Sequence, residues 1–362
     1  MSNSWNDTNE MLTRHAVKNR VPFMGTFELT PRCNLQCKMC YIRQNTNDEI
    51  ALSKELPAKE WIRIGEEARD AGMLHLLLTG GEVLVRQDFR EIYEALSMMG
   101  FFIQIATNAT LVTLEIAKWL GGNPPAKVDV TLYGASPEMY GKICGYEGGY
   151  RKAVEGIDLL LREGISVNLR TTAIRENAGD FDALAGFADE KGLEFAVVDY
   201  IQPRREGSGT DPVGERLSPS ESVEYMCHVK DHFDKKYGKP KIVFDPEKQN
   251  ATDVYEIEED TAFGCASGKC SFWLAWDGRM LPCGDCVSPY AAISDGSFVH
   301  CWKQLQKKVL AVPKCKECME CQLRDYCKAC PARLKNETGY FDKPAQYLCD
   351  IALLSEKSDL GG

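Results

Sequence analysis

The chain has 362 residues, of which 44% are hydrophobic and 27% are charged, and these values suit one large globular domain plus a smaller one. A formal net charge of −10 and a pI near 5.2 argue against a nucleic acid or an anionic membrane as partner. No apolar run approaches the length of a membrane span, and residues 1–19 are polar, without the apolar core of a signal peptide. We therefore expect a cytoplasmic protein.

The chain contains 16 cysteines, which is a high number for its length. Many of them lie only two or three residues apart. In a secreted protein such thiols would indicate disulfides, but nothing in the sequence supports secretion. Closely spaced thiols in a cytosolic protein indicate metal ligands.

After an expected tail over residues 1–20, short apolar runs alternate with amphipathic helical patterns. A glycine follows each of four helical patterns, in the position of a left-handed helix cap. Six strand–helix units predict a parallel sheet with helices outside, and right-handed crossovers would roll it into a closed or partial barrel. Chemistry in such folds collects at the loops that follow the strands. The runs begin near Phe23, Met73, Phe102, Val128, Ser166 and Glu194, and the glycines are Gly72, Gly100, Gly164 and Gly192.

Three cysteines follow the first expected strand with CxxxCxxC spacing, namely Cys33, Cys37 and Cys40. Such a short loop can ligate three irons of a four-iron cluster from one side. A structural cluster would normally have a fourth cysteine ligand, and none is nearby in the sequence. An open metal position marks a reactive site. A zinc knuckle or stray buried thiols are the alternatives.

This motif resembles that of the radical S-adenosylmethionine (radical SAM) enzymes. The resemblance implies that the three cysteines hold a [4Fe–4S] cluster and that the amino and carboxylate groups of SAM chelate the fourth iron. It also implies that an electron from the cluster cleaves SAM to methionine and a 5′-deoxyadenosyl radical, which abstracts a hydrogen atom from the substrate. The fold implied is a partial (β/α)6 barrel, similar to a TIM barrel, over residues 21–210.

The second strand leads into Thr79-Gly80-Gly81-Glu82. The glycines allow the backbone to approach a ligand closely, and the carboxylate suits an ammonium group. This stretch resembles the family's GGE motif, which binds the SAM amino group, although Val83 stands where a proline is usual. An ordinary strand–helix turn is the alternative.

Further SAM-binding candidates lie at the ends of later strands. Short polar side chains there can bond ribose hydroxyls, and an arginine suits the SAM carboxylate. By resemblance, a polarizable methionine in the cysteine loop lies beside the adenine, and the stretch Ile201-Gln202-Pro203-Arg204 lies near SAM. Turn capping or surface ion pairs would explain the polar side chains and the Arg170 position equally well. The candidates are Met39, Thr107, Asn108, Thr131, Arg170 and Arg204.

Residues 211–260 are expected to form a linker that contains one helix. Arg205–Arg216 is rich in glycine, proline and charge, which favours a loop. A helix is predicted to begin after Ser218 as its N-cap, with Pro219 in its first position, and to end at Gly238. Residues 239–260 lack a clear pattern.

A second group of cysteines begins at Cys265 and extends over residues 261–362. Eight of its thiols are enough for two four-cysteine sites, and their CxxC spacing also fits zinc. The order C…GxxxxC…CxxCxxxxxC…C resembles the SPASM domain, a radical SAM extension that binds two auxiliary [4Fe–4S] clusters. The resemblance assigns Cys265, Cys270, Cys283 and Cys330 to the first auxiliary cluster and Cys318, Cys321, Cys327 and Cys349 to the second. If Cys270 is not a ligand, the first auxiliary cluster has an open iron or is smaller, unless Cys286 or Cys315 substitutes for it.

These resemblances imply a radical SAM oxidoreductase that has three [4Fe–4S] clusters and modifies a peptide. The expected substrate is a ribosomally synthesised peptide, which gains a crosslink, a thioether or an inverted residue. The alternatives are sulfatase maturation by formylglycine formation, a small-molecule radical dehydrogenation, and an iron–sulfur electron carrier without SAM chemistry. About 20 residues before the first strand leave no room for a leader-binding module. The peptide is therefore expected to bind either directly or through a separate leader-peptide-binding protein. A flavodoxin- or ferredoxin-type electron donor is the other expected partner.

Overall fold

The computed structural model describes residues 5–205, 212–238 and 261–358. Its contacts divide the chain into two compact units. We call residues 24–216 with 273–279 the barrel unit, and residues 1–23, 217–272 and 280–362 the cysteine-rich unit.

The barrel unit is built on six parallel strands in the order β1-β4-β5-β6-β7-β8, so the predicted parallel sheet is confirmed. Each strand starts within two residues of the apolar run that predicted it. A separate short parallel pair, β2 (Arg32–Cys33) with β3 (Gln44–Asn45), carries the first cysteine. The six strands are β1 (Met24–Glu28), β4 (His75–Thr79), β5 (Phe102–Thr107), β6 (Lys127–Thr131), β7 (Val167–Thr172) and β8 (Glu194–Val198).

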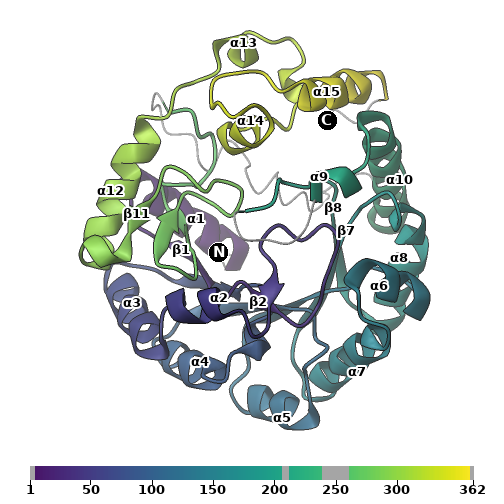
Figure 1. Ribbon diagram of the computed structural model, residues 1–362. Coiled ribbons are helices and arrows are strands. Elements are labelled where there is room, and N and C mark those ends of the chain that lie inside the picture. Colours follow the sequence, from purple (N-terminus) through teal and green to yellow (C-terminus); the bar gives the residue numbers. More distant parts are fainter. Residues whose placement is uncertain (1–4, 206–211, 239–260, 359–362) are drawn as a thin grey trace. The chain divides into compact units, whose positions relative to one another are not determined.

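Helices α3, α4, α5, α7 and α8 follow one another around the outside of these strands (Figure 1). The glycines after α3, α4, α7 and α8 all have positive φ, as the cap prediction requires. Helices α5 and α6, which the apolar pattern did not predict, begin at side-chain caps on Thr113 and Ser136. The helices are α2 (Glu49–Lys54), α3 (Ala58–Asp70), α4 (Phe89–Ser97), α5 (Leu114–Gly122), α6 (Pro137–Cys144), α7 (Gly149–Arg162), α8 (Phe181–Lys191) and α9 (Pro212–Glu215), with short 3₁₀ helices η1 (Val83–Val85) and η2 (Ala178–Asp180).

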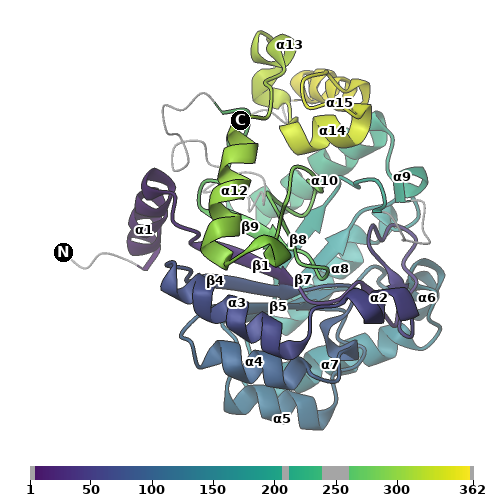
Figure 2. The ribbon, with the colours of Figure 1, turned by 60° about the vertical axis from the view of Figure 1, so that its left-hand side comes forward.

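The two faces of the barrel sheet differ in chemistry because side chains alternate along each strand. Phe27, Leu78 and Val130 are fully buried on one face, and Figure 2 shows α3 and α4 lying along β4 and β5 on one side of the sheet. The other face carries buried polar side chains, among them Glu28 and Asp129. Polar groups of this face and of the loops after the strands are therefore available for a site.

The cysteine-rich unit is mostly helical. Residues expected to form a tail include helix α1, and the predicted helix after Ser218 is α10, with a complete capping box between Ser218 and Glu221. Residues 239–260, expected to be irregular, lie outside the described residues. The helices are α1 (Trp5–Asn19), α10 (Pro219–Tyr237), α12 (Phe298–Leu310), α13 (Lys316–Met319), α14 (Pro331–Thr338) and α15 (Gln346–Lys357), with η4 (Ile293–Asp295) and η5 (Arg324–Tyr326); the strands are β9 (Ser271–Leu274), β10 (Arg279–Leu281) and β11 (Ala291–Ala292).

None of the helices in the described part of the chain is long and apolar enough to cross a membrane.

Candidate active site and thiol clusters

The loop after β1 brings the three predicted thiols into one group, in which Cys37 is buried and Cys33 and Cys40 are half-buried. Burial raises the pKa of Cys33 and raises that of Cys40 to about 11, and the neighbouring thiols add to both effects. The pKa of Cys37 is raised first by a hydrogen bond with Cys144 and then by burial. Iron would reverse these shifts, because a coordinating thiol is deprotonated outright. Without iron, the three thiols keep their protons. A metal that binds here would displace these protons.

The end of α6 fixes one side of this loop. The backbone N–H of Gln36 donates to the carbonyl of Cys144 over 2.7 Å, and that of Lys38 donates to the carbonyl of Ile143 over 3.1 Å. Gly145 caps α6 with a φ of 64°, and a Cβ there would lie 2.9 Å from the Gln36 Cβ. A left-handed cap without a side chain is thus required where the loop meets the helix.

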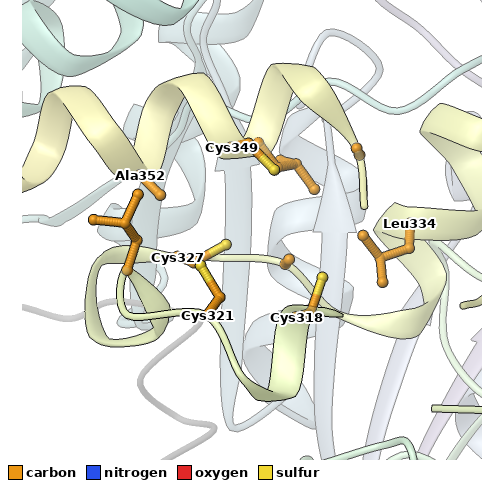
Figure 3. Close-up of a pocket in the computed structure, with 10 residues that line it drawn as sticks. Cys318, Cys321, Cys327, Leu334, Cys349 and Ala352 are labelled. Atoms are coloured by element: carbon orange, nitrogen blue, oxygen red, sulfur yellow. The ribbon is translucent and has the colours of Figure 1, made fainter. Parts of the chain in front are cut away.

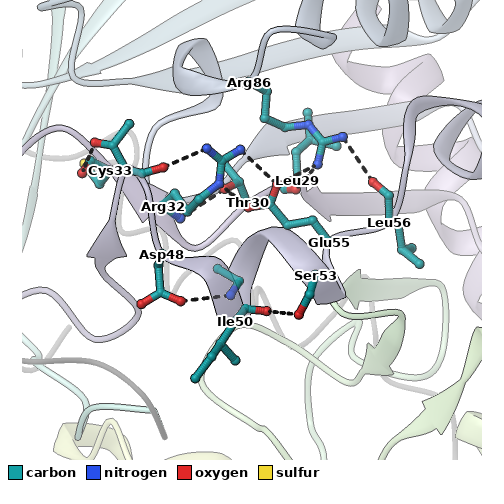
Figure 4. Close-up of polar contacts among 12 residues, drawn as sticks. Leu29, Thr30, Arg32, Cys33, Asp48, Ile50, Ser53, Glu55, Leu56 and Arg86 are labelled. Carbon is teal, nitrogen blue, oxygen red and sulfur yellow. Dashed lines mark hydrogen bonds and ion pairs between the residues drawn. The ribbon is translucent and has the colours of Figure 1, made fainter.

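A buried charge network fixes the chain just before Cys33 (Figure 4). Arg32 binds Glu55 through two bonds, Nε to Oε1 over 2.7 Å and Nη2 to Oε2 over 2.9 Å. Arg86 donates to the carbonyl of Leu29 over 2.8 Å and approaches the same carboxylate at 3.4 Å. Thr30 also donates to Glu55. Sequence reasoning missed this network because its members lie 23 and 31 residues apart.

The glycine turn after β4 packs against the same segment. Gly81 N donates to Thr30 O over 2.7 Å and Glu82 N donates to Arg32 O over 2.9 Å. A Cβ on Gly81 would lie 2.5 Å from the Arg32 carbonyl oxygen. The glycines therefore admit the backbone of the cysteine loop, a reason that sequence reasoning did not supply.

The side chain of Glu82, which follows β4, is buried and lies beside the end of β5. Its carboxylate accepts hydrogen bonds from Thr107 Oγ1 at 2.8 Å, Asn108 N at 2.7 Å and Leu84 N at 3.1 Å. Burial raises its pKa, and these hydrogen bonds oppose the rise. Glu82 also lies close enough to Cys33 to raise the pKa of that thiol, second to the effect of burial. The predicted SAM residues Glu82, Thr107 and Asn108 are thus brought together beside the first cysteine.

Asn108 contacts the sulfur directly. Its Nδ2 lies 3.8 Å from Cys33 Sγ and donates to Asn34 Oδ1 over 3.0 Å, while Thr110 Oγ1 donates to its Oδ1 over 2.6 Å. The backbone N–H of Leu35 also donates to Cys33 Sγ over 3.3 Å. Donors to sulfur are typical of iron–sulfur sites, where they tune the cluster's potential. Asn34 had no signal of its own in the sequence, whereas Thr110 belongs to the polar stretch after the third expected strand.

The strand ends further along the sheet place Thr131 opposite Arg170. Arg170 Nη2 pairs with Asp129 Oδ2 over 3.1 Å. Within the described residues, Arg170 Nε and Asp129 Oδ1 are buried and have no hydrogen-bond partner. These open polar atoms fit a site for a polar ligand, and Asp129 was not predicted.

After β8, Arg205 rather than Arg204 connects the chain to the cysteine loop. Arg205 pairs with the fully buried Glu28 over 2.8 Å, and its guanidinium lies 4.9 Å from the centre of the Tyr41 ring. Trp273 Nε1 donates to the same carboxylate over 2.9 Å. Arg204 is exposed and Met39 is buried.

In the cysteine-rich unit, five thiols gather around the first predicted auxiliary site. Burial raises the pKa of Cys283, with Cys286, Cys330 and Cys265 among the neighbours that add to the rise. Burial also raises the pKa of Cys270 to about 12, and Cys265 is the thiol that adds to it. The structure thus places Cys286 with the predicted ligands, and both Cys270 and Cys286 remain candidates for the fourth position.

The second predicted auxiliary site is a pocket lined by Cys318, Cys321, Cys327 and Cys349 (Figure 3). Its remaining walls are apolar, including Leu334 and Ala352. Cys349 comes from α15, whereas Cys318 lies in α13, Cys321 lies between α13 and η5, and Cys327 follows η5. Sulfur donors in an apolar cavity suit an iron–sulfur cluster.

Across the described ranges, no group of three or more His, Cys, Asp or Glu side chains is close enough to hold a single metal ion. The apolar walls around the second thiol group and the donors to sulfur at Cys33 fit iron–sulfur clusters.

Comparison with known proteins supports this interpretation. The chain is 24% identical over 344 residues to an AdoMet-dependent heme synthase of Methanosarcina barkeri, covering 90% of this chain and 96% of the relative. It is 24% identical over 342 residues to the antilisterial bacteriocin subtilosin biosynthesis protein AlbA of Bacillus subtilis, covering 89% and 70%.

Two solved structures share the fold over nearly the whole chain, the cysteine-rich part included. Streptococcus suis SuiB bound to precursor peptide SuiA aligns with a TM-score of 0.68 and 18% identity, covering 95% of this chain and 81% of SuiB. Native anSMEcpe with bound AdoMet and Cp18Cys peptide aligns with a TM-score of 0.68 and 17% identity, covering 93% and 96%. The expected barrel with a C-terminal cysteine-rich extension is confirmed. Residues 27–188 match the family described as the radical SAM superfamily, whose members bind SAM and a [4Fe–4S] cluster, so this part of the chain is similar to a radical SAM domain.

Proposed function

We propose that this protein cleaves SAM reductively and abstracts a hydrogen atom from a peptide, most plausibly in the maturation of a ribosomally synthesised peptide. The observation that carries the proposal is the convergence of Cys33, Cys37 and Cys40 beside the Glu82 turn at the carboxyl ends of the strands. When bound there, a cluster and SAM supply the 5′-deoxyadenosyl radical. The protein holds the reactants in place and excludes water.

Individual residues have distinct tasks in this proposal. The three thiols hold the cluster, and Asn108 with the Leu35 N–H donates to sulfur. The carboxylate of Glu82 is already bonded to Thr107, Asn108 and Leu84, so it acts mainly by fixing the turn whose backbone receives the SAM amino group. Arg170 and Thr131 would hold the carboxylate and ribose, and Met39 and Arg204 would border the remainder of SAM.

The two thiol groups of the cysteine-rich unit would hold two further [4Fe–4S] clusters that accept the electron left on the substrate. Cys318, Cys321, Cys327 and Cys349 hold one of them. Cys265, Cys283 and Cys330 hold the other, with Cys270 or Cys286 as the fourth ligand. A flavodoxin- or ferredoxin-type protein would supply the first electron, and a separate protein would present the leader of the peptide.

Support for a peptide substrate comes from the solved structures. SuiB is bound to a precursor peptide, and anSMEcpe is bound to a peptide together with AdoMet. Their fold extends over more than nine-tenths of this chain. Formylglycine formation on a sulfatase remains an alternative within the same chemistry.

A second candidate is radical chemistry on a tetrapyrrole. The M. barkeri heme synthase aligns over 96% of its own length, and an Fe-coproporphyrin III synthase of the same organism aligns over 89% of its length at 26% identity. Offering each substrate class separately distinguishes the two. Deuterium from a labelled peptide should appear in 5′-deoxyadenosine, whereas a tetrapyrrole substrate would instead change its visible spectrum.

The chemistry itself is tested by replacing Cys33, Cys37 and Cys40 together with Ala and comparing that variant with Cys227→Ala, a cysteine outside all three groups. After anaerobic reconstitution, the triple variant should form no 5′-deoxyadenosine and should keep about two-thirds of the iron. The control should match the unaltered protein in both measurements. Loss of all iron from the triple variant would contradict the two auxiliary sites, and undiminished 5′-deoxyadenosine would contradict the catalytic site.

A further inference from the structure

Arg43 lies where the cysteine loop returns to its own starting strand. It is the third residue after Cys40, and the two residues that follow it form β3, in which Gln44 pairs with Arg32 and Asn45 with Cys33. The backbone thus brings residue 43 back beside the strand that carries the first thiol.

The side chain of Arg43 has donors without acceptors. Its Nε and Nη1 are buried, and neither has a hydrogen-bond partner anywhere in residues 5–205, 212–238 or 261–358. Arg32 and Arg86, the two arginines that hold the chain just before Cys33, differ from Arg43 because they bond to carboxylates and to backbone carbonyls. A buried donor left unbonded costs about 1–3 kcal/mol, and more when the group is charged. Such an exception points to an acceptor that the protein itself does not supply.

The charge of Arg43 acts on two of the three thiols. Cys37 has its pKa raised chiefly by the hydrogen bond with Cys144 and by burial, and the positive charge of Arg43 opposes the rise. For Cys40, burial and then the nearby Cys37 raise the pKa, and the positive charge of Arg43 again opposes the rise. The guanidinium therefore lies close enough to Cys37 and Cys40 for its positive charge to act on both sulfurs.

We infer that Arg43 is a positioning residue for the cluster at Cys33, Cys37 and Cys40, to whose sulfur its unbonded Nε–H and Nη1–H donate. This inference rests on the proposed function. One electron entering this site adds one negative charge without forming or breaking a bond. A buried cation that donates to sulfur stabilises the reduced state, so Arg43 raises the reduction potential and eases the electron transfer that starts catalysis.

The test uses the full-length protein with all clusters reconstituted. We compare Arg43→Gln, which keeps donors but removes the charge, with Arg43→Lys, which keeps the charge. Arg90→Gln serves as the control, because Arg90 pairs with Glu94 on the exposed surface of α4. The midpoint potential of the N-terminal cluster is measured by electron paramagnetic resonance during a redox titration. Subtracting the spectrum of the triple cysteine variant isolates its signal, and iron content and SAM affinity are measured in parallel.

We expect Arg43→Gln to keep the iron content and to shift the midpoint to a more negative potential, with Arg43→Lys closer to the unaltered protein and Arg90→Gln unchanged. If Arg43→Gln loses the iron of the N-terminal cluster, the result for Arg43→Lys decides. An Arg43→Lys variant that keeps both the iron and the midpoint potential supports the inference, and loss of the iron from both variants overturns it. If Arg43→Gln has the midpoint potential of the unaltered protein, the inference is overturned. If that variant also binds SAM more weakly, Arg43 is assigned to the SAM carboxylate instead. An N-terminal cluster signal that does not respond to SAM in the unaltered protein would defeat the proposed function rather than this inference.

Discussion

Gly81 is the position where the smallest substitution should do most damage to the candidate site. An added Cβ would lie 2.5 Å from the carbonyl oxygen of Arg32 and 2.7 Å from that of Pro31. Both of these neighbours are backbone atoms, so no side chain can rotate away. Gly81→Ala must therefore separate the turn after β4 from the chain that leads into Cys33.

The destabilisation has two sources, the overlap with backbone and the weakening of two hydrogen bonds. Overpacking of this kind costs about 1–3 kcal/mol, and the hydrogen bonds from Gly81 N and Glu82 N to the same segment contribute about 1 kcal/mol each. Together these sources give about 3–5 kcal/mol, which would lower the melting temperature by about 6–20 °C for a unit of this size. The cluster loop should suffer more than the rest of the barrel, because the displaced turn borders the first thiol.

The assay compares Gly81→Ala with Gly186→Ala. Gly186 is exposed in helix α8, and a Cβ there would meet nothing within 4 Å. That control should be neutral or stabilise by ~0.5–1 kcal/mol, because alanine restricts the unfolded chain and suits a helix. Thermal unfolding, followed by circular dichroism, and iron content are measured for both. If Gly81→Ala keeps both the melting temperature and the iron of the unaltered protein, the close approach of the two backbones is not what requires glycine there.

Two further substitutions test the charge network and the second auxiliary site. Glu55→Ala leaves the buried guanidinium groups of Arg32 and Arg86 without their shared carboxylate and should lower the free energy of unfolding by about 3–5 kcal/mol. The control Glu60→Ala, on the outer helix α3, should lower it by under about 1 kcal/mol. Equal melting temperatures for the two variants would contradict a structural role for the network. Cys349→Ala should lower the iron content by about one-third while 5′-deoxyadenosine formation persists without substrate, and unchanged iron would remove Cys349 from the second site.

The architecture of the barrel was predictable because each of its signals is local. Runs near Phe23 and Phe102 became β1 and β5, and the glycines after four helices took the left-handed cap that they predicted. Ser218 likewise caps α10 as expected. Apolar alternation and caps involve residues within a few positions of one another, so a single sequence records them.

The polar surroundings of the site were less predictable because their partners are distant in sequence. Glu28 and Arg205 are separated by 177 residues, and nothing near either residue announces the pair. The carboxylate of Glu82 was expected to meet a ligand, yet the protein's own donors bond it. Only the geometry of the strand ends reveals which polar groups remain open.

The interactions around the cysteine loop also bear on how it acquires iron. The segment before Cys33 is held by the Glu55 network and by the glycine turn, and the segment after it is held by carbonyls of α6. A loop fixed on both sides by the protein loses little conformational entropy when it binds a cluster. We therefore expect the chain around Cys37 to be folded before iron arrives. In that case hydrogen exchange at the amides of residues 36 and 38 would be slow in the iron-free protein, and fast exchange there would show that the cluster, not the packing against α6, orders the loop.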